Sequence, residues 1–313
     1  MSAGRVTWLG PQRREPTLAA SLQSLGLPAD AQVATITAGW QEREDDDQEL
    51  REHLGHRAVN LAIYRRTERV FERDGELQRA ARGRQEDLKA LQGLYRIRLH
   101  HAMNACFDLL RRSGNGAVLR EERRAAIETV RELDRRHLEQ VRERHDAFEQ
   151  RVRPAERDAL AHERAEVEKL VRESGAIAIA GGHVAVLLNR LRLFSFERLA
   201  AGRLVVAWSA GAMALSETVV LFRDDPPHGP GHPEALEQGL ALASGVVPLP
   251  HARRRLDLDD GPRVLVMARR FAPAACVPMD EGARLDWSGA SWVMPRGTRR
   301  LGIEGRVETW TEA

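Results

Sequence analysis

The sequence predicts an α/β protein, in which a mostly parallel sheet is flanked by helices and a long helical hairpin is inserted. Short apolar runs that end in glycine, such as GAIAIAGG at 175–182, are typical of buried parallel strands. From about residue 59 to 173, strand patterns are nearly absent and charges of both signs alternate. We therefore expect three regions: a first part of the α/β domain at 1–58, an inserted helical region at 59–173, and a second part of the α/β domain at 174–313.

The first region reads as strand, helix, strand. RVTWLG at 5–10 is apolar enough for a buried strand, and PTLAASLQSLG at 16–26 has helical character. Gly26 and Pro28 follow that helix, as expected where a helix stops. AQVATITAGW at 31–40 then supplies the second strand.

The inserted region predicts two long helices joined by a turn at RSGNGA (112–117), with a break near Pro154. Each helix carries one apolar stripe, at spacings of three and four in the first helix and more sparsely in the second. The stripes are Leu91, Tyr95, Leu99, Met103, Phe107 and Leu110, then Ile127, Val130, Leu138, Val141, Phe148 and Val152. Such narrow faces need a partner, which is the hairpin itself, a second copy in a homo-oligomer, or the α/β body. Four histidines on these charged helices are expected to face solvent: His100, His101, His137 and His145.

The third region again shows the alternating strand and helix patterns of an α/β domain. HVAVLLNRLRLF at 183–194 predicts a helix, LVVAW at 204–208 a strand, and GVVPLP at 245–250 another strand. Four later segments read as strands and hairpins: RVLVMARRF (263–271), ACVPMDEGARLDW (275–287), ASWVMPRG (290–297) and RRLGIEGRVETW (299–310). In open parallel sheets, sites form at the carboxyl ends of strands.

Composition excludes several classes of function. The formal net charge of +2 gives no general attraction to nucleic acid or to anionic membranes. No apolar run approaches the ~18 residues that span a membrane, and the N-terminus lacks a signal-peptide core. Cys106 and Cys276 are expected to be buried free thiols in a cytoplasmic protein. His228 and His232 lack a third ligand at a defined spacing, so we expect no metal, and we expect no cofactor.

Ser209 is the strongest candidate for chemistry. It follows LVVAW and is followed only by small residues, which allow a strand to turn sharply into a helix. A serine hydroxyl needs a base to take its proton and backbone N–H groups to stabilise the oxyanion. His251, directly after the strand GVVPLP, is the best-placed base, and the glycines of AIAIAGGH supply a second close backbone approach. The alternative is an ordinary strand end with structural glycines.

Four segments in order, GGH, WSAGA, PHARRRL and VPMDEGARL, resemble the peptidase E and cyanophycinase family. These are serine hydrolases on a flavodoxin-like fold similar to that of the class I glutamine amidotransferases. The resemblance covers about 174–290, and 1–58 more loosely, but not the helical insertion. The resemblance implies that Ser209 is the nucleophile, His251 the base, and Asp224 or Glu281 the acid. It also implies that the Gly182 and Ala210 amides form the oxyanion hole. His183, Trp208 and Arg255 are the implied substrate contacts.

Two functions follow from these residues. The first is a serine peptidase or isopeptidase that cleaves small peptides, including Asp-containing ones, through an acyl-enzyme. The second is an inactive relative in which the hairpin serves as an interaction module. Ala207 replaces the family's first glycine, and His183 replaces its usual Asn or Asp, which puts specificity in question. A glutamine amidotransferase would need cysteine at position 209.

Overall fold

A central seven-stranded sheet organises the computed structural model, which describes residues 4–224 and 231–310. The strand order is β11-β10-β1-β5-β4-β2-β3, with parallel pairing from β1 to β3 and antiparallel pairing at β10 and β11. The strands are β1 (Val6–Leu9), β2 (Val33–Ile36), β3 (Ala58–Asn60), β4 (Ala176–Ile179), β5 (Val205–Trp208), β10 (Arg284–Trp287) and β11 (Trp292–Val293). The α/β class and the mostly parallel sheet are therefore confirmed.

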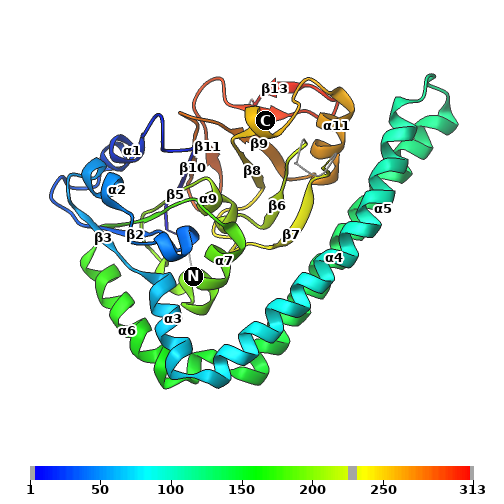
Figure 1. Cartoon of the computed structure of the whole chain (residues 1–313). Coiled ribbons are helices and arrows are strands. Elements are labelled where there is room, and N and C mark those ends of the chain that lie inside the picture. The colour runs from blue at the N-terminus through cyan, green and yellow to red at the C-terminus, as the bar shows by residue number, and fades with distance from the viewer. Residues whose placement is uncertain (1–3, 225–230, 311–313) are drawn as a thin grey trace.

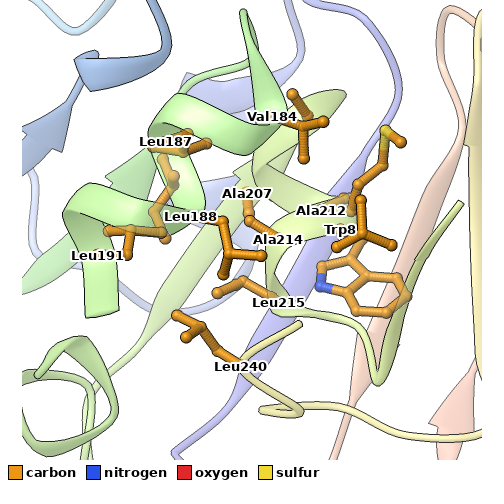
Figure 2. Packing of buried hydrophobic residues seen from close by; sticks show 14 of the residues in the cluster. Trp8, Val184, Leu187, Leu188, Leu191, Ala207, Ala212, Ala214, Leu215 and Leu240 are labelled. Atoms are coloured by element: carbon orange, nitrogen blue, oxygen red, sulfur yellow. The ribbon is translucent and has the colours of Figure 1, made fainter. Parts of the chain in front are cut away.

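Helices cover both faces of the sheet because alternate strand residues point to opposite sides. On one face, α1 (Leu18–Ser24) and α2 (Gln48–His53) pack on residues such as Val206. On the other face, Figure 2 shows Trp8 and Ala207 of the strands lying against residues of α7 (Val184–Leu193) and α9 (Ala210–Leu215). Gly211 allows α9 to lie close to β4, since an added Cβ would come 2.6 Å from the Ile179 carbonyl oxygen.

The helical region leaves the sheet after β3 and returns to it at β4. It contains α3 (Ile63–Arg73), α4 (Gly75–Arg111), α5 (Ala117–Val152), the 3₁₀ turn η2 (Pro154–Glu156) and α6 (Asp158–Glu173). The antiparallel pair α4 and α5, here called the arm, runs past β7 and α11, and its tip projects beyond the body (Figure 1). At the base, the buried Glu163 carboxylate of α6 accepts hydrogen bonds from Arg66 and Arg69 of α3. No helix in the described part of the chain is long and apolar enough to cross a membrane.

A buried polar cluster fixes the arm to the body. The Asp134 carboxylate of α5 accepts hydrogen bonds from the Tyr95 hydroxyl (2.7 Å) and from Arg270 Nη2 (2.7 Å). Arg270 also donates to the Pro233 carbonyl oxygen at 2.6 Å. Because Arg270 is only 4% exposed, its charge depends on Asp134 for compensation.

Smaller elements complete the body: η1 (Ala38–Arg43), α8 (Phe196–Leu199), α10 (Ala252–Arg255), α11 (Gly261–Arg270), β6 (Thr218–Leu221), β7 (Glu234–Gln238), β8 (Val246–Pro250), β9 (Ala275–Met279), β12 (Arg299–Leu301) and β13 (Val307–Thr309). β8 and β9 pair in parallel, while β6–β7 and β12–β13 are antiparallel pairs. The C-terminal end of β8 leads directly into His251.

Three sequence predictions were wrong. Residues 263–271 belong to helix α11, which Asp260 caps by accepting a hydrogen bond from the Arg263 amide. His137 is 3% exposed and stacks on Tyr95, with ring centroids 4.1 Å apart. His145 is also enclosed, because Glu237 of β7 lies 2.9 Å from its ring nitrogen. The rings of both histidines are directed at strand β7 of the body. Cys106 and Cys276 are buried free thiols, as predicted.

Candidate active site

Ser209 stands on a strained turn between β5 and α9. Its backbone has φ 51° and ψ −119°, a conformation that L-residues rarely adopt and that costs about 1–3 kcal/mol. The turn lifts Ser209 out of the core, so that it is partly exposed while Trp208 and Ala210 on either side are buried. This is the geometry by which a strand-to-helix turn presents a side chain at the edge of a parallel sheet.

Two glycines bring a second backbone segment against Ser209. A Cβ added to Gly181 would lie 2.9 Å from Ser209 Cβ, 3.6 Å from Ser209 Oγ and 3.6 Å from the Ala210 amide nitrogen. Gly182 adopts φ +117°, and a Cβ there would lie 2.4 Å from the carbonyl oxygen of Gly39. Only glycine fits both positions. The chain therefore passes beside the serine and the amide that follows it.

Gly39 completes this crossing from a distant part of the sequence. Its carbonyl oxygen accepts a hydrogen bond from the His183 amide at 2.7 Å. A Cβ on Gly39 would come 2.6 Å from the Gly181 carbonyl oxygen. The segment after β2 thus fixes the loop after β4. Gly39 was not predicted as a site residue, although a glycine near the end of the predicted strand at 31–40 was the available signal.

His251 follows β8 in a left-handed conformation, with φ 57° and ψ 36°. Burial lowers the pKa of its imidazole from the usual value, and the positive charge of Arg255 lowers this pKa further, so the ring is neutral near pH 7. Its Nδ1 atom is buried and has no hydrogen-bond partner among the described residues. No hydrogen bond joins the His251 ring to Ser209 Oγ.

Asp280 holds the segment that carries His251, a role that the sequence analysis missed. One oxygen of this buried carboxylate accepts a hydrogen bond from the Arg253 amide in α10, at 3.1 Å. The His251 amide in turn donates to the Met279 carbonyl oxygen of β9, at 3.2 Å. The last residue of β9 and the residue after it therefore fix the backbone on either side of His251.

The two candidate acids lie in different places. Glu281 lines the same cleft as Ser209 and His251, and its charge raises the pKa of His251. Asp224 does not line that cleft. Its carboxylate accepts a hydrogen bond from the Asp257 amide at 2.7 Å and pairs with Arg263 of α11 at 2.9 Å. Glu281 therefore shares the cleft with His251, whereas Asp224 pairs with α11 outside it.

The three expected substrate contacts, His183, Trp208 and Arg255, all line the cleft. His183 Nδ1 accepts a hydrogen bond from the Val186 amide at 3.3 Å, which caps α7 and leaves the proton on Nε2. The Arg255 guanidinium lies over the Phe222 ring at 5.8 Å and has no carboxylate partner among the described residues. Both side chains therefore offer N–H donors to a ligand.

The cleft itself has a volume of about 2000 Å³. Besides Ser209, its lining includes Arg13 and Arg14 of the N-terminal segment and residues of helix α4 of the arm. The contribution of the arm to the cleft was not predicted. Within the described residues, no group of three or more His, Cys, Asp or Glu side chains is placed to hold a metal ion, and His228 lies outside those residues.

No family model matches this sequence, and no curated protein is recognisably similar to it in sequence. Among solved structures, the crystal structure of a peptidase from an acI-B1 Actinobacterium resembles the chain at a TM-score of 0.46 and 14% identity. The alignment covers 98% of this chain and 97% of that one. A likeness at this level assigns neither fold family nor activity.

Proposed function

We propose that this protein is a serine hydrolase that cleaves peptide or isopeptide bonds through an acyl-enzyme. One observation carries the proposal: Ser209, on a strained turn, shares a cleft with His251 and Glu281 and is crossed by the Gly181–Gly182 segment. A purely structural strand end requires neither the strain at Ser209 nor the tight crossing of glycines beside it. The proposed fold is that of the class I glutamine amidotransferases and of the peptidase E and cyanophycinase family.

In the proposed reaction, Ser209 Oγ attacks the carbonyl carbon while His251 takes the hydroxyl proton. The Gly182 and Ala210 amides are the proposed oxyanion donors, supported by the closeness of the Gly181 position to the Ala210 nitrogen. His251 then gives the proton to the leaving amine as the C–N bond breaks. Water hydrolyses the ester, which releases the acid and restores Ser209. Substrate binding must bring the imidazole to the hydroxyl, since such hydrogen bonds often form only in the complex.

Glu281 is the proposed acid that orients His251, because it lies in the cleft and acts on the imidazole charge. A matched pair of isosteric variants tests this choice. We expect Glu281→Gln to lower the rate at which Ser209 reacts. Asp224→Asn should leave that rate unchanged and should lower stability, since it weakens the pair with Arg263. The reverse pattern would assign the role to Asp224.

The cleft favours a small acidic peptide as the substrate. Arg254 and Arg255 line it beside His251, and neither has a carboxylate partner among the described residues. An unpaired guanidinium binds a carboxylate with two parallel hydrogen bonds. The proposed substrates therefore include Asp-containing peptides, with no cofactor, nucleic acid or membrane involved in the reaction, and a cytoplasmic location is part of the same proposal.

A fluorophosphonate probe tests the proposed chemistry directly. We expect the wild-type protein to be labelled at Ser209, and Ser209→Ala to abolish labelling. His251→Ala should slow it by about 10²-fold or more, the usual contribution of a general base. Ser113→Ala, at the exposed turn of the arm, is the matched control and should label like the wild type. An unlabelled wild-type protein, or labelling that survives Ser209→Ala, would refute the proposal.

One observation favours a second function, in which the arm joins two copies of the chain. Leu94 and Ile97 are 63% and 60% exposed on α4, and neither lines the cleft. Large apolar side chains one turn apart on an exposed helix are typical of a contact surface. Light scattering after size-exclusion chromatography would show a dimer that Leu94→Glu converts to monomer. A monomeric wild-type protein would contradict this function.

A further inference from the structure

We propose that helix α4 of the arm forms a distant subsite of the catalytic cleft, in which Lys89 binds a carboxylate of the substrate. The enzyme would then select peptides that extend several residues beyond the cleaved bond. This inference rests on the proposed function, since it assigns a substrate class to the same cleft.

One face of α4 is turned toward the cleft. The cleft-lining residues of this helix recur at spacings of three and four: Gln85, Leu88, Lys89, Gln92 and Arg96. Residues with that spacing lie on a single side of a helix. The arm therefore forms a continuous wall of the space that also contains Ser209.

The length of helix α7 gives an estimate of the distance from Ser209 to α4. It starts directly after the Gly182–His183 segment, and Ala185 and Asn189 line the cleft along it. Asn189 Nδ2 donates a hydrogen bond to Gln85 Oε1 of α4 at 3.2 Å. The six residues from His183 to Asn189 correspond to about 9 Å of helix, which an extended peptide spans with about three residues. We therefore expect a dipeptide at Ser209 to be too short to reach α4.

Among the described residues, Lys89 is the cation of this wall that has no carboxylate partner. Its neighbours are engaged, because Arg96 and Gln92 both donate to the Glu234 carboxylate at 2.8 Å. Lys89 is exposed and has no carboxylate partner among the described residues. Glu237, which also lines the cleft, is already bound by Arg192 and His145. The group that complements Lys89 is therefore a carboxylate brought by the ligand.

The wall is held in place before substrate arrives. Tyr95 lies between Gln92 and Arg96 of the cleft face in sequence, and its hydroxyl bonds to Asp134 and to Arg270 of the body. The Ala235 amide also donates to that hydroxyl, at 3.1 Å. A preorganised subsite loses less entropy on binding than one that must first be ordered.

The test uses blocked hexapeptides of alanine in which one Glu is moved along the chain, with Gln peptides as the neutral counterparts and blocked dipeptides as the short reference. We expect the wild-type kcat/KM to favour one Glu peptide over its Gln counterpart by about fivefold, as for an exposed ion pair. The preferred Glu should lie about three residues from the cleaved bond. The preference should shrink in 0.5 M salt, because salt screens exposed charges at about that concentration.

Lys89→Glu should remove this preference and transfer it to the matching Lys peptide. Lys169→Glu is the control, since Lys169 is the only other lysine of the chain, is exposed on α6 and does not line the cleft. Rates are divided by the fraction of Ser209 that a fluorophosphonate labels. Equal rates for Glu and Gln peptides, or equal behaviour of the two lysine variants, would overturn the subsite.

The two proposals fail in different ways. If the wild-type Ser209 does not react with the fluorophosphonate, the proposed hydrolase fails. The subsite is then decided by binding of fluorescein-labelled Glu and Gln hexapeptides to Ser209→Ala, with and without Lys89→Glu. Tighter binding of the Glu peptide that depends on Lys89 supports the subsite, and its absence refutes it.

Discussion

Replacing Gly181 with alanine isolates the closeness of two backbone segments at the candidate nucleophile. The new Cβ would lie 2.9 Å from Ser209 Cβ, whereas ordinary contacts begin at 3.4 Å, so the serine or the loop must move by about half an ångström. Overpacking by one methyl group costs about 1–3 kcal/mol. Because a displacement of about 1 Å costs about 10²-fold in rate, we expect fluorophosphonate labelling of Ser209 to slow by about tenfold.

The matched control is Gly93→Ala on α4. Gly93 is exposed and its Cβ would meet nothing within 4 Å, so alanine should stabilise the protein by up to about 1 kcal/mol through helix propensity. Urea unfolding measures both stabilities, and labelling kinetics measure both rates. If Gly181→Ala labels at the wild-type rate and has wild-type stability, the close approach of the Gly181 backbone to Ser209 is refuted.

Three further changes test other parts of the molecule. Since burial and the charge of Arg255 lower the pKa of His251, labelling should be lost on acidification at an inflection below pH 6.5, and Arg255→Ala should move that inflection upward in a pH–rate profile. Asp134→Ala leaves Arg270 buried without compensation, so the free energy of unfolding in urea should fall by about 3–5 kcal/mol. Arg69 and Arg66 hold the pKa of Glu163 at about 2, below its usual 4.5. The contribution of Glu163 to the free energy of unfolding is therefore complete above pH 4.5 and is lost as the pH falls toward 2. In urea titrations from pH 6 to pH 2, Glu163→Gln should weaken that dependence on pH.

Local patterns were enough to predict most of the elements. GAIAIAGG and LVVAW each contain a short apolar run followed by small residues, and both form parallel strands of the sheet. The turn at 112–117 and the break at Pro154 match the ends of α4 and α5. Helix α11 was missed because residues 263–271 contain an apolar run typical of a strand, and the helix-starting signals at Asp260 and Pro262 precede it.

The features that sequence patterns could not predict are long-range contacts. His145 appeared to lie on a charged helix, but Glu237, 92 positions later, covers it. Asp224 was expected as an acid only from the family resemblance, and no local pattern indicates that Arg263 binds it instead. Likewise, nothing local in α4 shows that it lines the cleft, because that depends on how the arm packs against the body.

The hydrogen bonds of Glu163 between α3 and α6 have a consequence for how the sequence of such a protein can vary. Glu163 bonds to both Arg66 and Arg69, so the two ends of the insertion are tied together at its base between β3 and β4. The tip of the arm, which projects beyond its contacts with the body, should therefore tolerate changes in length while the sheet keeps its strand order. Ser209 lies on a later stretch of chain than the helix that faces it. In the proposed enzyme, the reacting serine and the helix that binds the ligand therefore belong to separate stretches of the chain, so substitutions in α4 should alter ligand choice without changing Ser209.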